Sequence, residues 1–205
     1  MIPAAIESSR VFAYPFAGYW RDVGTIKAYW DANMDLLNSQ SGLNLSEWHV
    51  RTNVEEEGRL GDRPPTRISP KSSVQNAFVS PGCIIEGEVK NSILSPGVFV
   101  AATASVTDSV VMHDSHIHAG ARVQRAILDK LTVVGNNAVV GSYRAGIPNK
   151  EKPDFLSSGL TLVGKGTEIP ANFNIGENTI LYPKLKPEDY HCSDIPPGET
   201  IRPST

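Results

Sequence analysis

Three histidines lie close together in the segment His113-Asp114-Ser115-His116-Ile117-His118. Neutral imidazole is a common ligand for transition metals, and imidazole also works as a general base near neutral pH. His113 and His118 are separated by four residues, a spacing that zinc sites use. The segment could therefore hold a zinc ion, provided that the fold supplies a third protein ligand.

Three arginines follow in or just beyond the same region, at Arg122, Arg125 and Arg144. A guanidinium group can bind a phosphate through two parallel hydrogen bonds, so neighbouring arginines favour a site for a phosphorylated ligand. The alternative is a solvated surface that carries scattered charge. Which of the two applies depends on the fold that positions these side chains.

Residues 89–138 repeat with a period of 17 residues. The repeated positions form four rows, which are Val89, Val106 and Val123; Leu94, Val111 and Leu128; Val100, Ile117 and Val134; and Ala104, Ala121 and Ala138. Self-similarity at a fixed period is typical of solenoids, and neither a helix nor an alternating strand has this spacing. Within a coil the aliphatics are five or six residues apart. The pattern predicts a mainly β fold, a parallel β-helix of hexapeptide repeats with three short strands per coil.

The same period indicates what surrounds the histidines. A third zinc ligand would have to lie one coil away from His113 or His118. The four positions one coil away are occupied by Pro96, Ala101, Lys130 and Gly135. None of these binds zinc except, poorly, the lysine. His116 and His118 flank the inward Ile117, so we expect both to point outward as surface histidines.

Composition divides the chain into two domains. Residues 1–65 contain all three tryptophans and one apolar helical period, which predicts an amphipathic helix over roughly 25–38 with Thr25 as its N-cap. The positions of that period are Ile26, Tyr29, Trp30, Asn33, Met34 and Leu37. A polar, extended linker then ends at Pro64-Pro65. Residues 66–205 form the β-helix domain, with an inserted loop near 142–159 and a proline-rich tail.

Global properties exclude several classes of protein. The net charge of −3 argues against a nucleic-acid binder, which usually has a basic excess. The apolar runs are too short for a membrane span, and the first residues do not form a signal peptide. Cys83 and Cys192 do not make a disulfide framework, and we expect each to be a small core or surface residue. These properties favour a cytoplasmic protein.

The most specific local motif is Gly18-Tyr19-Trp20-Arg21-Asp22-Val23-Gly24-Thr25. Followed by a helix, an extended linker and hexapeptide repeats, it resembles the C-terminal part of bacterial ADP-glucose pyrophosphorylases (glucose-1-phosphate adenylyltransferases). Residues 79–100, 106–117 and 121–130 are similar to the β-helix of that family in order and spacing. The resemblance covers roughly residues 1–182. It implies a left-handed β-helix after a short α+β remnant of a nucleotidyltransferase domain.

The resemblance also implies a reaction and an assembly. In the family, the intact enzyme makes ADP-glucose and pyrophosphate from ATP and glucose 1-phosphate for glycogen synthesis. Its members form homotetramers, in which the β-helix takes part, and are controlled by phosphorylated sugars. Such enzymes begin with a glycine-rich loop that binds the phosphates of ATP. No such loop opens this chain, and Gly164-Lys165-Gly166 is expected to form a coil corner.

We therefore expect a truncated, split or separately expressed C-terminal piece that has no turnover and no cofactor of its own. In the resembled enzymes, the position of Asp22 is one of two carboxylates that hold Mg²⁺, and that of Trp20 lines the glucose 1-phosphate pocket. The alternatives are that Asp22 caps the following helix and that Trp20 packs in a core. Lys165 resembles a lysine that binds an anionic activator in the plant enzymes. With Arg122, Arg125 and Arg144 it is a candidate for an allosteric site.

Two other functions stay open. The chain could be a stand-alone regulatory or assembly subunit without catalysis. It could also be a hexapeptide acyltransferase or resemble the γ-class carbonic anhydrases, which bind zinc on such a scaffold partly through a His-x4-His pair. We expect the chain to form a dimer or larger species, because the first and last coils of a solenoid expose unpaired strand edges.

Overall fold

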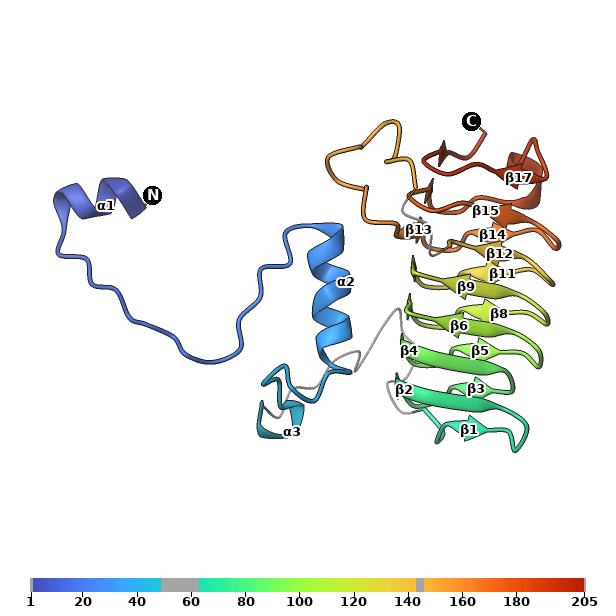
Figure 1. Ribbon diagram of the computed structural model, residues 1–205, viewed down its shortest axis with the longest axis horizontal. Helices are drawn as coiled ribbons and strands as arrows, with labels where there is room; N and C mark the ends of the chain where they lie inside the picture. Colours follow the sequence, from blue (N-terminus) through green and yellow to red (C-terminus); the bar gives the residue numbers. More distant parts are fainter. Residues whose placement is uncertain (1, 49–62, 143–145, 205) are drawn as a thin grey trace.

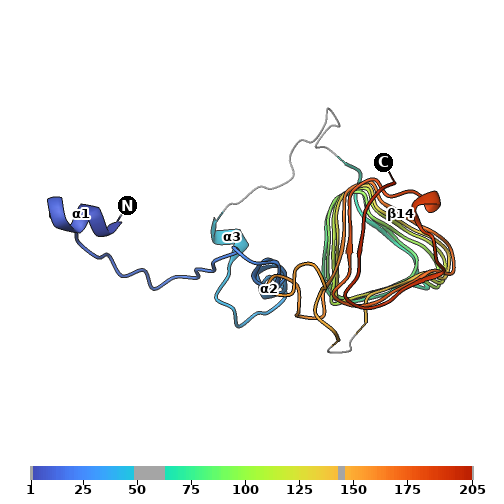
Figure 2. The ribbon, with the colours of Figure 1, turned by 90° about the horizontal axis from the view of Figure 1, so that it is seen from above.

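A computed structural model describes residues 2–48, 63–142 and 146–204 (Figure 1). Three helices precede the strands: α1 (Ile2–Ser8), α2 (Ile26–Asp35) and α3 (Leu45–Trp48). The strands then wind into a β-helix whose cross-section is triangular, as Figure 2 shows end-on. The fold expected from the repeats is confirmed. No helix within the described ranges is long and apolar enough to span a bilayer.

The β-helix has three faces, and all paired strands are parallel. Face A contains β1 (Arg67–Ile68), β3 (Ile84–Ile85), β5 (Phe99–Val100), β8 (His116–Ile117), β11 (Val133–Val134) and β14 (Glu168–Ile169). Face B contains β6 (Ser105–Thr107), β9 (Arg122–Gln124), β12 (Val139–Val140), β15 (Asn174–Ile175) and β17 (Asp194–Ile195). Face C contains β7 (Val110–Val111), β10 (Ala126–Leu128), β13 (Thr161–Val163), β16 (Ile180–Leu181) and β18 (Thr200–Ile201). The longer β2 (Ser73–Val79) and β4 (Glu88–Leu94) turn from face B onto face C.

The pairing register reproduces the rows of the sequence. Val100 pairs with Ile117 on face A, and Ile117 pairs with Val134 in the next coil. All three side chains are completely buried. The small side chains of Ala104, Ala121 and Ala138 are buried as well, where the chain turns between faces A and B. Each of these strands thus directs an aliphatic into the coil, and stacking the coils makes these into a continuous core.

The corner between faces B and C requires a left-handed backbone. Asn76, Asn91, Asp108 and Arg125 occupy it in successive coils, with φ of 47°, 46°, 48° and 45°. Asparagine and aspartate adopt this conformation more readily than other side chains. Asn76 and Asn91 also form a ladder, because the Asn76 amide donates to Oδ1 of Asn91 over 2.9 Å. Arg125 is the residue of this row whose type the left-handed turn does not favour.

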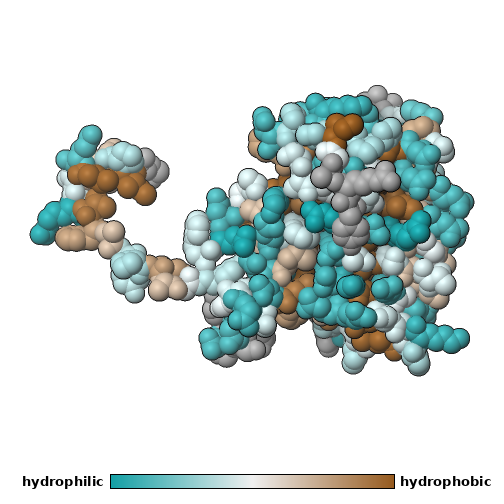
Figure 3. Space-filling view, in the orientation of Figure 1, coloured by the Kyte–Doolittle hydropathy of each residue, from teal (hydrophilic) through white to brown (hydrophobic). Residues whose placement is uncertain are grey.

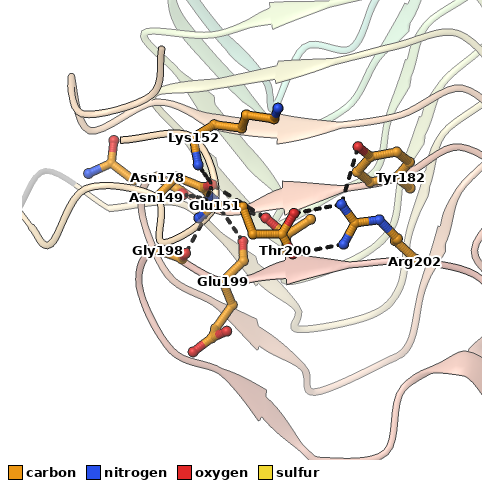
Figure 4. A network of polar contacts seen from close by, with 9 residues as sticks. All are labelled: Asn149, Glu151, Lys152, Asn178, Tyr182, Gly198, Glu199, Thr200 and Arg202. Carbon is orange, nitrogen blue, oxygen red and sulfur yellow. Dashed lines mark hydrogen bonds and ion pairs between the residues drawn. The ribbon is translucent and has the colours of Figure 1, made fainter. Parts of the chain in front are cut away.

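An insertion loop (described residues 146–160) leaves the β-helix at this same corner, between β12 and β13. The completely buried Asn149 ties the loop to the last coils (Figure 4). Its amide donates to the carbonyls of Asn178 and Gly198, and its Oδ1 accepts from the backbone amide of Lys152. Arg202 adds an ion pair with Glu151. The loop is therefore fastened to the end of the β-helix.

The chain differs from the sequence expectations mainly outside the repeats. Helix α2 begins after Thr25 as expected, and Thr25 Oγ1 accepts a hydrogen bond from the Ala28 amide. The helix ends at Asp35 because its last turn tightens, with the Leu36 amide bonding three residues back to Asn33. Helices α1 and α3 are too short to show an apolar period, so the sequence did not predict them. Most of the expected extended linker lies outside the described residues.

Three smaller expectations can be compared with the structure. Gly164-Lys165-Gly166 forms a corner between β13 and β14, with Gly166 at a φ of 67°. Both cysteines are free: Cys83 is buried in the core and Cys192 is exposed. The proline-rich tail contains a 3-10 turn at Pro187–Asp189 and the strands β17 and β18. The tail thus continues the coils instead of being only an extended cap.

The inward row on face A predicts the effect of a buried charge. Ile117→Asp would place a carboxylate among Val100 and Val134 with no partner, which costs several kcal/mol. We expect this variant not to fold, and Ile117→Ala to lose about 2–5 kcal/mol of unfolding free energy. Circular dichroism melting measures both. His116→Asp, at the exposed neighbouring position, is the control and should melt at nearly the same temperature as the parent chain. An equal loss of stability in the two aspartate variants would refute the inward position of Ile117.

The C-terminal tail should loosen in acid. The backbone amides of Lys186 and Ser204 donate to the carboxylate of Asp189, and these hydrogen bonds hold its pKa below the ordinary value. Its contribution to stability is therefore complete above the unfolded pKa of about 3.9, and it disappears as the pH falls through the lower folded value. Hydrogen exchange at the Ser204 amide should accelerate, relative to its intrinsic rate, between about pH 5 and pH 2. Asp189→Asn should remove this pH dependence. If the Ser204 amide of the parent chain and that of the variant showed the same change with pH, the role of the Asp189 carboxylate would be contradicted.

Candidate functional site

The motif that precedes α2 is an extended segment braced against the helix. Tyr19 Oη donates to the carboxylate of Asp35 over 2.8 Å, and the Arg21 guanidinium pairs with the same carboxylate at 2.7 Å. Burial, with the nearby Asp35 carboxylate, raises the pKa of Tyr19, so its hydroxyl stays a donor. Trp20 and Asp22 take no part in these contacts, and both are exposed. Trp20 is 76% exposed.

The exposed Asp22 has a defined position. Its Oδ1 accepts a hydrogen bond from the Gly24 amide over 3.0 Å, which closes the turn into α2. The helix cap itself is Thr25, so Asp22 does not cap the helix. The exposure of Trp20 likewise shows that it is not part of a core within the described residues. Neither of the two alternatives raised from the sequence therefore describes these side chains.

Helix α2 connects this motif to the β-helix. It packs along β4, and Trp30 Nε1 donates to the carbonyl of Asp108 over 3.0 Å at the corner between faces B and C. The guanidinium carbon of Arg125 lies 5.3 Å from the centre of the Trp30 ring, which is a cation–π contact. A cleft of about 460 Å³ remains between α2 and face C. Its lining includes Tyr29, Asn33, Phe78, Ser80, His113 and Lys130.

Comparison with known proteins relates this arrangement to an enzyme family. Residues 65–155 match the family model "GlmU-like, C-terminal hexapeptide", and residues 1–39 match the model "Nucleotidyl transferase". The glucose-1-phosphate adenylyltransferase of Thermomicrobium roseum is 44% identical over 206 residues, which cover 99% of this chain and 47% of the relative. That of Acetivibrio thermocellus is 36% identical over 204 residues, 98% of this chain and 46% of the relative.

The chain matches the C-terminal part of the glucose-1-phosphate adenylyltransferases. It spans about half the length of these two relatives. The enzyme of Bacillus cytotoxicus is 42% identical over 140 residues, which cover 67% of this chain and 36% of that enzyme. The resemblance inferred from the motif at residues 18–25 and from the repeats is confirmed.

The adenylyltransferase match gives Asp22 a context for metal binding. Nucleotidyltransferases generally use Mg²⁺, a hard cation that proteins bind through one or two carboxylates together with substrate phosphates. The exposed carboxylate of Asp22, held by the Gly24 amide, fits one such ligand position. Within the described ranges, His, Cys, Asp and Glu side chains form no group of three that could hold a metal ion. Asp22 therefore fits as one ligand among others, and not as a complete site.

The candidate allosteric residues do not all lie together. Arg122 is exposed on β9, and Arg125 follows it at the corner between faces B and C. Lys165 lies in the turn after β13, at the opposite end of the face C strands. Arg144 lies outside the described residues. The structure thus places Arg122 at the start of face B, Arg125 at the corner between faces B and C, and Lys165 beyond the far end of the face C strands.

The three histidines have three different environments. His116 is exposed on face A, as the sequence predicted. Its ring lies 5.9 Å from that of Phe99. His118 is only half-buried. His113 is 7% exposed and lines the cleft below α2. The coil repeat could not predict this burial, because α2, an element outside the repeat, covers the position.

The bracing of the motif predicts a local effect of losing Asp35. Asp35→Ala removes the acceptor of the Tyr19 hydrogen bond, worth about 0.5–1.5 kcal/mol, and the nearer of the two carboxylates that pair with Arg21. We expect trypsin to cleave after Arg21 about three- to tenfold faster, because the segment leaves the helix more often. Lys186→Ala is the matched control, since it removes an ion pair with Glu168 on the β-helix that does not contact the motif. Unchanged cleavage after Arg21 in Asp35→Ala would show that the bracing has no effect.

Proposed function

We propose that this chain forms the β-helix and the adjoining motif of a glucose-1-phosphate adenylyltransferase. The reaction joins ATP and glucose 1-phosphate to give ADP-glucose and pyrophosphate, which serves glycogen synthesis. One observation carries the proposal. In a chain that aligns over nearly its full length with such enzymes, Trp20 and Asp22 are presented together on the outer side of a braced segment.

The proposal assigns each of these residues a task. Asp22 supplies a carboxylate to Mg²⁺, which when bound offsets negative charge on the phosphates. Trp20 offers a broad apolar face to the sugar of glucose 1-phosphate. Tyr19 and Arg21 do not face the substrates and instead fix the segment to α2 through Asp35. Fixed placement of both functional side chains is a requirement for positioning two substrates in line.

The chain has a second proposed role, in assembly and regulation. Apolar side chains are exposed throughout the segment before α2, and Figure 3 shows those of α1 as a brown patch. The exposed apolar side chains of this segment include Ile2, Ile6, Phe12, Tyr14 and Phe16. Such a surface exceeds what a monomer usually leaves open, which supports packing against further protein surface in a homo-oligomer. Arg122, exposed on face B, and Lys165, half-buried after β13, are two separate positions at which a phosphorylated-sugar effector could be bound.

A chimera tests the catalytic proposal. This chain replaces the matching half of the Thermomicrobium roseum enzyme, and ADP-glucose and pyrophosphate formation are assayed with Mg²⁺. We expect turnover, and we expect Asp22→Asn in the chimera to lower kcat about 100-fold or more, because an amide is a weaker ligand for a hard cation. Asp154→Asn, on the exposed part of the insertion loop, is the matched control and should keep full activity.

The outcomes are distinguishable. A folded chimera without turnover would contradict the adenylyltransferase proposal and would favour a non-catalytic assembly subunit. An active chimera in which Asp22→Asn keeps its full rate would contradict the metal role of Asp22 and leave the reaction intact. Circular dichroism and light scattering on each variant show that it is folded before activity is compared.

A further inference from the structure

Arg125 occupies a position at which its residue type is unexpected. Three members of its corner row are asparagine or aspartate, whereas Arg125 adopts the same left-handed backbone with a φ of 45°. An arginine side chain has no carboxylate or carboxamide, so arginine is less favourable in this conformation than asparagine or aspartate. The reason for an arginine must therefore lie in what its side chain contacts.

The Arg125 side chain joins two elements that lie far apart in the sequence. Its guanidinium stacks on the Trp30 ring of α2, and its Nη2 donates to the carbonyl of Ser158 in the insertion loop over 2.9 Å. Its backbone carbonyl also accepts from the Thr161 amide at the start of β13. Figures 1 and 2 both show the insertion loop beside α2. One side chain thus contacts the helix and the loop at the corner of the β-helix.

The loop end of this connection is held firmly. The amide of Gly159, next to Ser158, donates to Asn178 Oδ1 over 2.7 Å. Asn149 fastens the other end of the loop to the last coils, as Figure 4 shows. The position of Ser158 is therefore set by how the insertion loop sits on the end of the β-helix.

The helix end of the connection leads to the motif. Trp30 lies in the middle of α2, and Asp35 at the end of the same helix holds Tyr19 and Arg21. A helix moves as a rigid unit, so a shift at Trp30 displaces the segment that carries Trp20 and Asp22. The contacts form a continuous series from the last coils, through the loop and Arg125, to this segment.

We propose that Arg125 is a positioning residue that couples the insertion loop to α2, so that the seating of the loop sets the position of the Tyr19–Asp22 segment. This coupling goes beyond the proposed reaction and does not depend on it. Ordering of the loop fixes Ser158, Ser158 fixes the guanidinium, and the guanidinium holds the Trp30 ring. Release of the loop frees the guanidinium and lets α2 leave face C more often.

Hydrogen exchange of the full 205-residue chain, followed by mass spectrometry of peptides from α2, tests the coupling. Asn149→Ala releases the loop, and Arg125→Asn removes the guanidinium while leaving a residue that suits the left-handed corner. Each single variant should accelerate exchange in residues 26–35 by about tenfold, the size expected for one cation–π contact and one hydrogen bond. The double variant should exchange no faster than Arg125→Asn alone.

Two further variants keep the test decisive. Leu131→Asn changes a residue at a similar φ of 61° at another corner, so it controls for relief of backbone strain and should leave α2 exchange unchanged. Arg125→Lys keeps a cation near Trp30 but only one point donor, so exchange should be intermediate. Arg202→Ala, which removes the ion pair with Glu151 and the contact of the guanidinium with the Tyr182 ring, replaces Asn149→Ala if that variant does not fold. Accelerations that multiply in the double variant, or an Arg125→Asn chain with unchanged α2 exchange, would overturn the proposal.

Discussion

The inside of each triangular coil has room for one aliphatic side chain per strand, and the rest of the structure depends on this constraint. Because the backbone of every coil is hydrogen bonded to the next, a residue such as Ile117 must match Val100 and Val134 in size and register. In the part of the chain that the structure describes, the candidate ligand-binding side chains lie on the outer faces, at the corners or in segments added to the coils.

The corner between faces B and C is where most of these additions meet. The left-handed turn at Asp108 presents its carbonyl to Trp30, and the insertion loop leaves the β-helix at the same edge. Helix α2 rests there without any completely buried residue of its own, so its attachment depends on a few directed contacts more than on apolar burial.

Features that arise from local chemistry or from repetition can be predicted from the sequence. The rows through Ile117, the N-cap at Thr25 and the corner at Gly166 all result from spacing and residue type, and the structure confirms each. Contacts between elements without a shared period are a different matter. Trp30 and Asp108 are 78 residues apart, and nothing in either local sequence pairs them. The burial of His113 was missed for the same reason.

The roles of Arg125 and Asp35 show a related limit. From the sequence, Arg125 is a candidate phosphate ligand, whereas in the structure its guanidinium lies on Trp30 and its Nη2 bonds to the insertion loop. Its position among asparagines and aspartates in the 17-residue register was a usable signal, because arginine is a poor choice for that turn. The alternation of Tyr19 and Arg21 with Trp20 and Asp22 was a second one. Both signals require knowing which residues share a corner or a side of the chain.

The central claim is that α2 has one defined position on the β-helix, from which the motif is presented. Spin labels at Lys27→Cys on α2 and Lys90→Cys on β4, both exposed positions, test it in a chain in which Cys192 is replaced by serine. Pulsed electron–electron double resonance measures the distribution of distances between the two labels. A single narrow distribution is the result predicted by a fixed helix. A broad distribution, of the kind that a tethered helix without a docking position gives, would contradict the account.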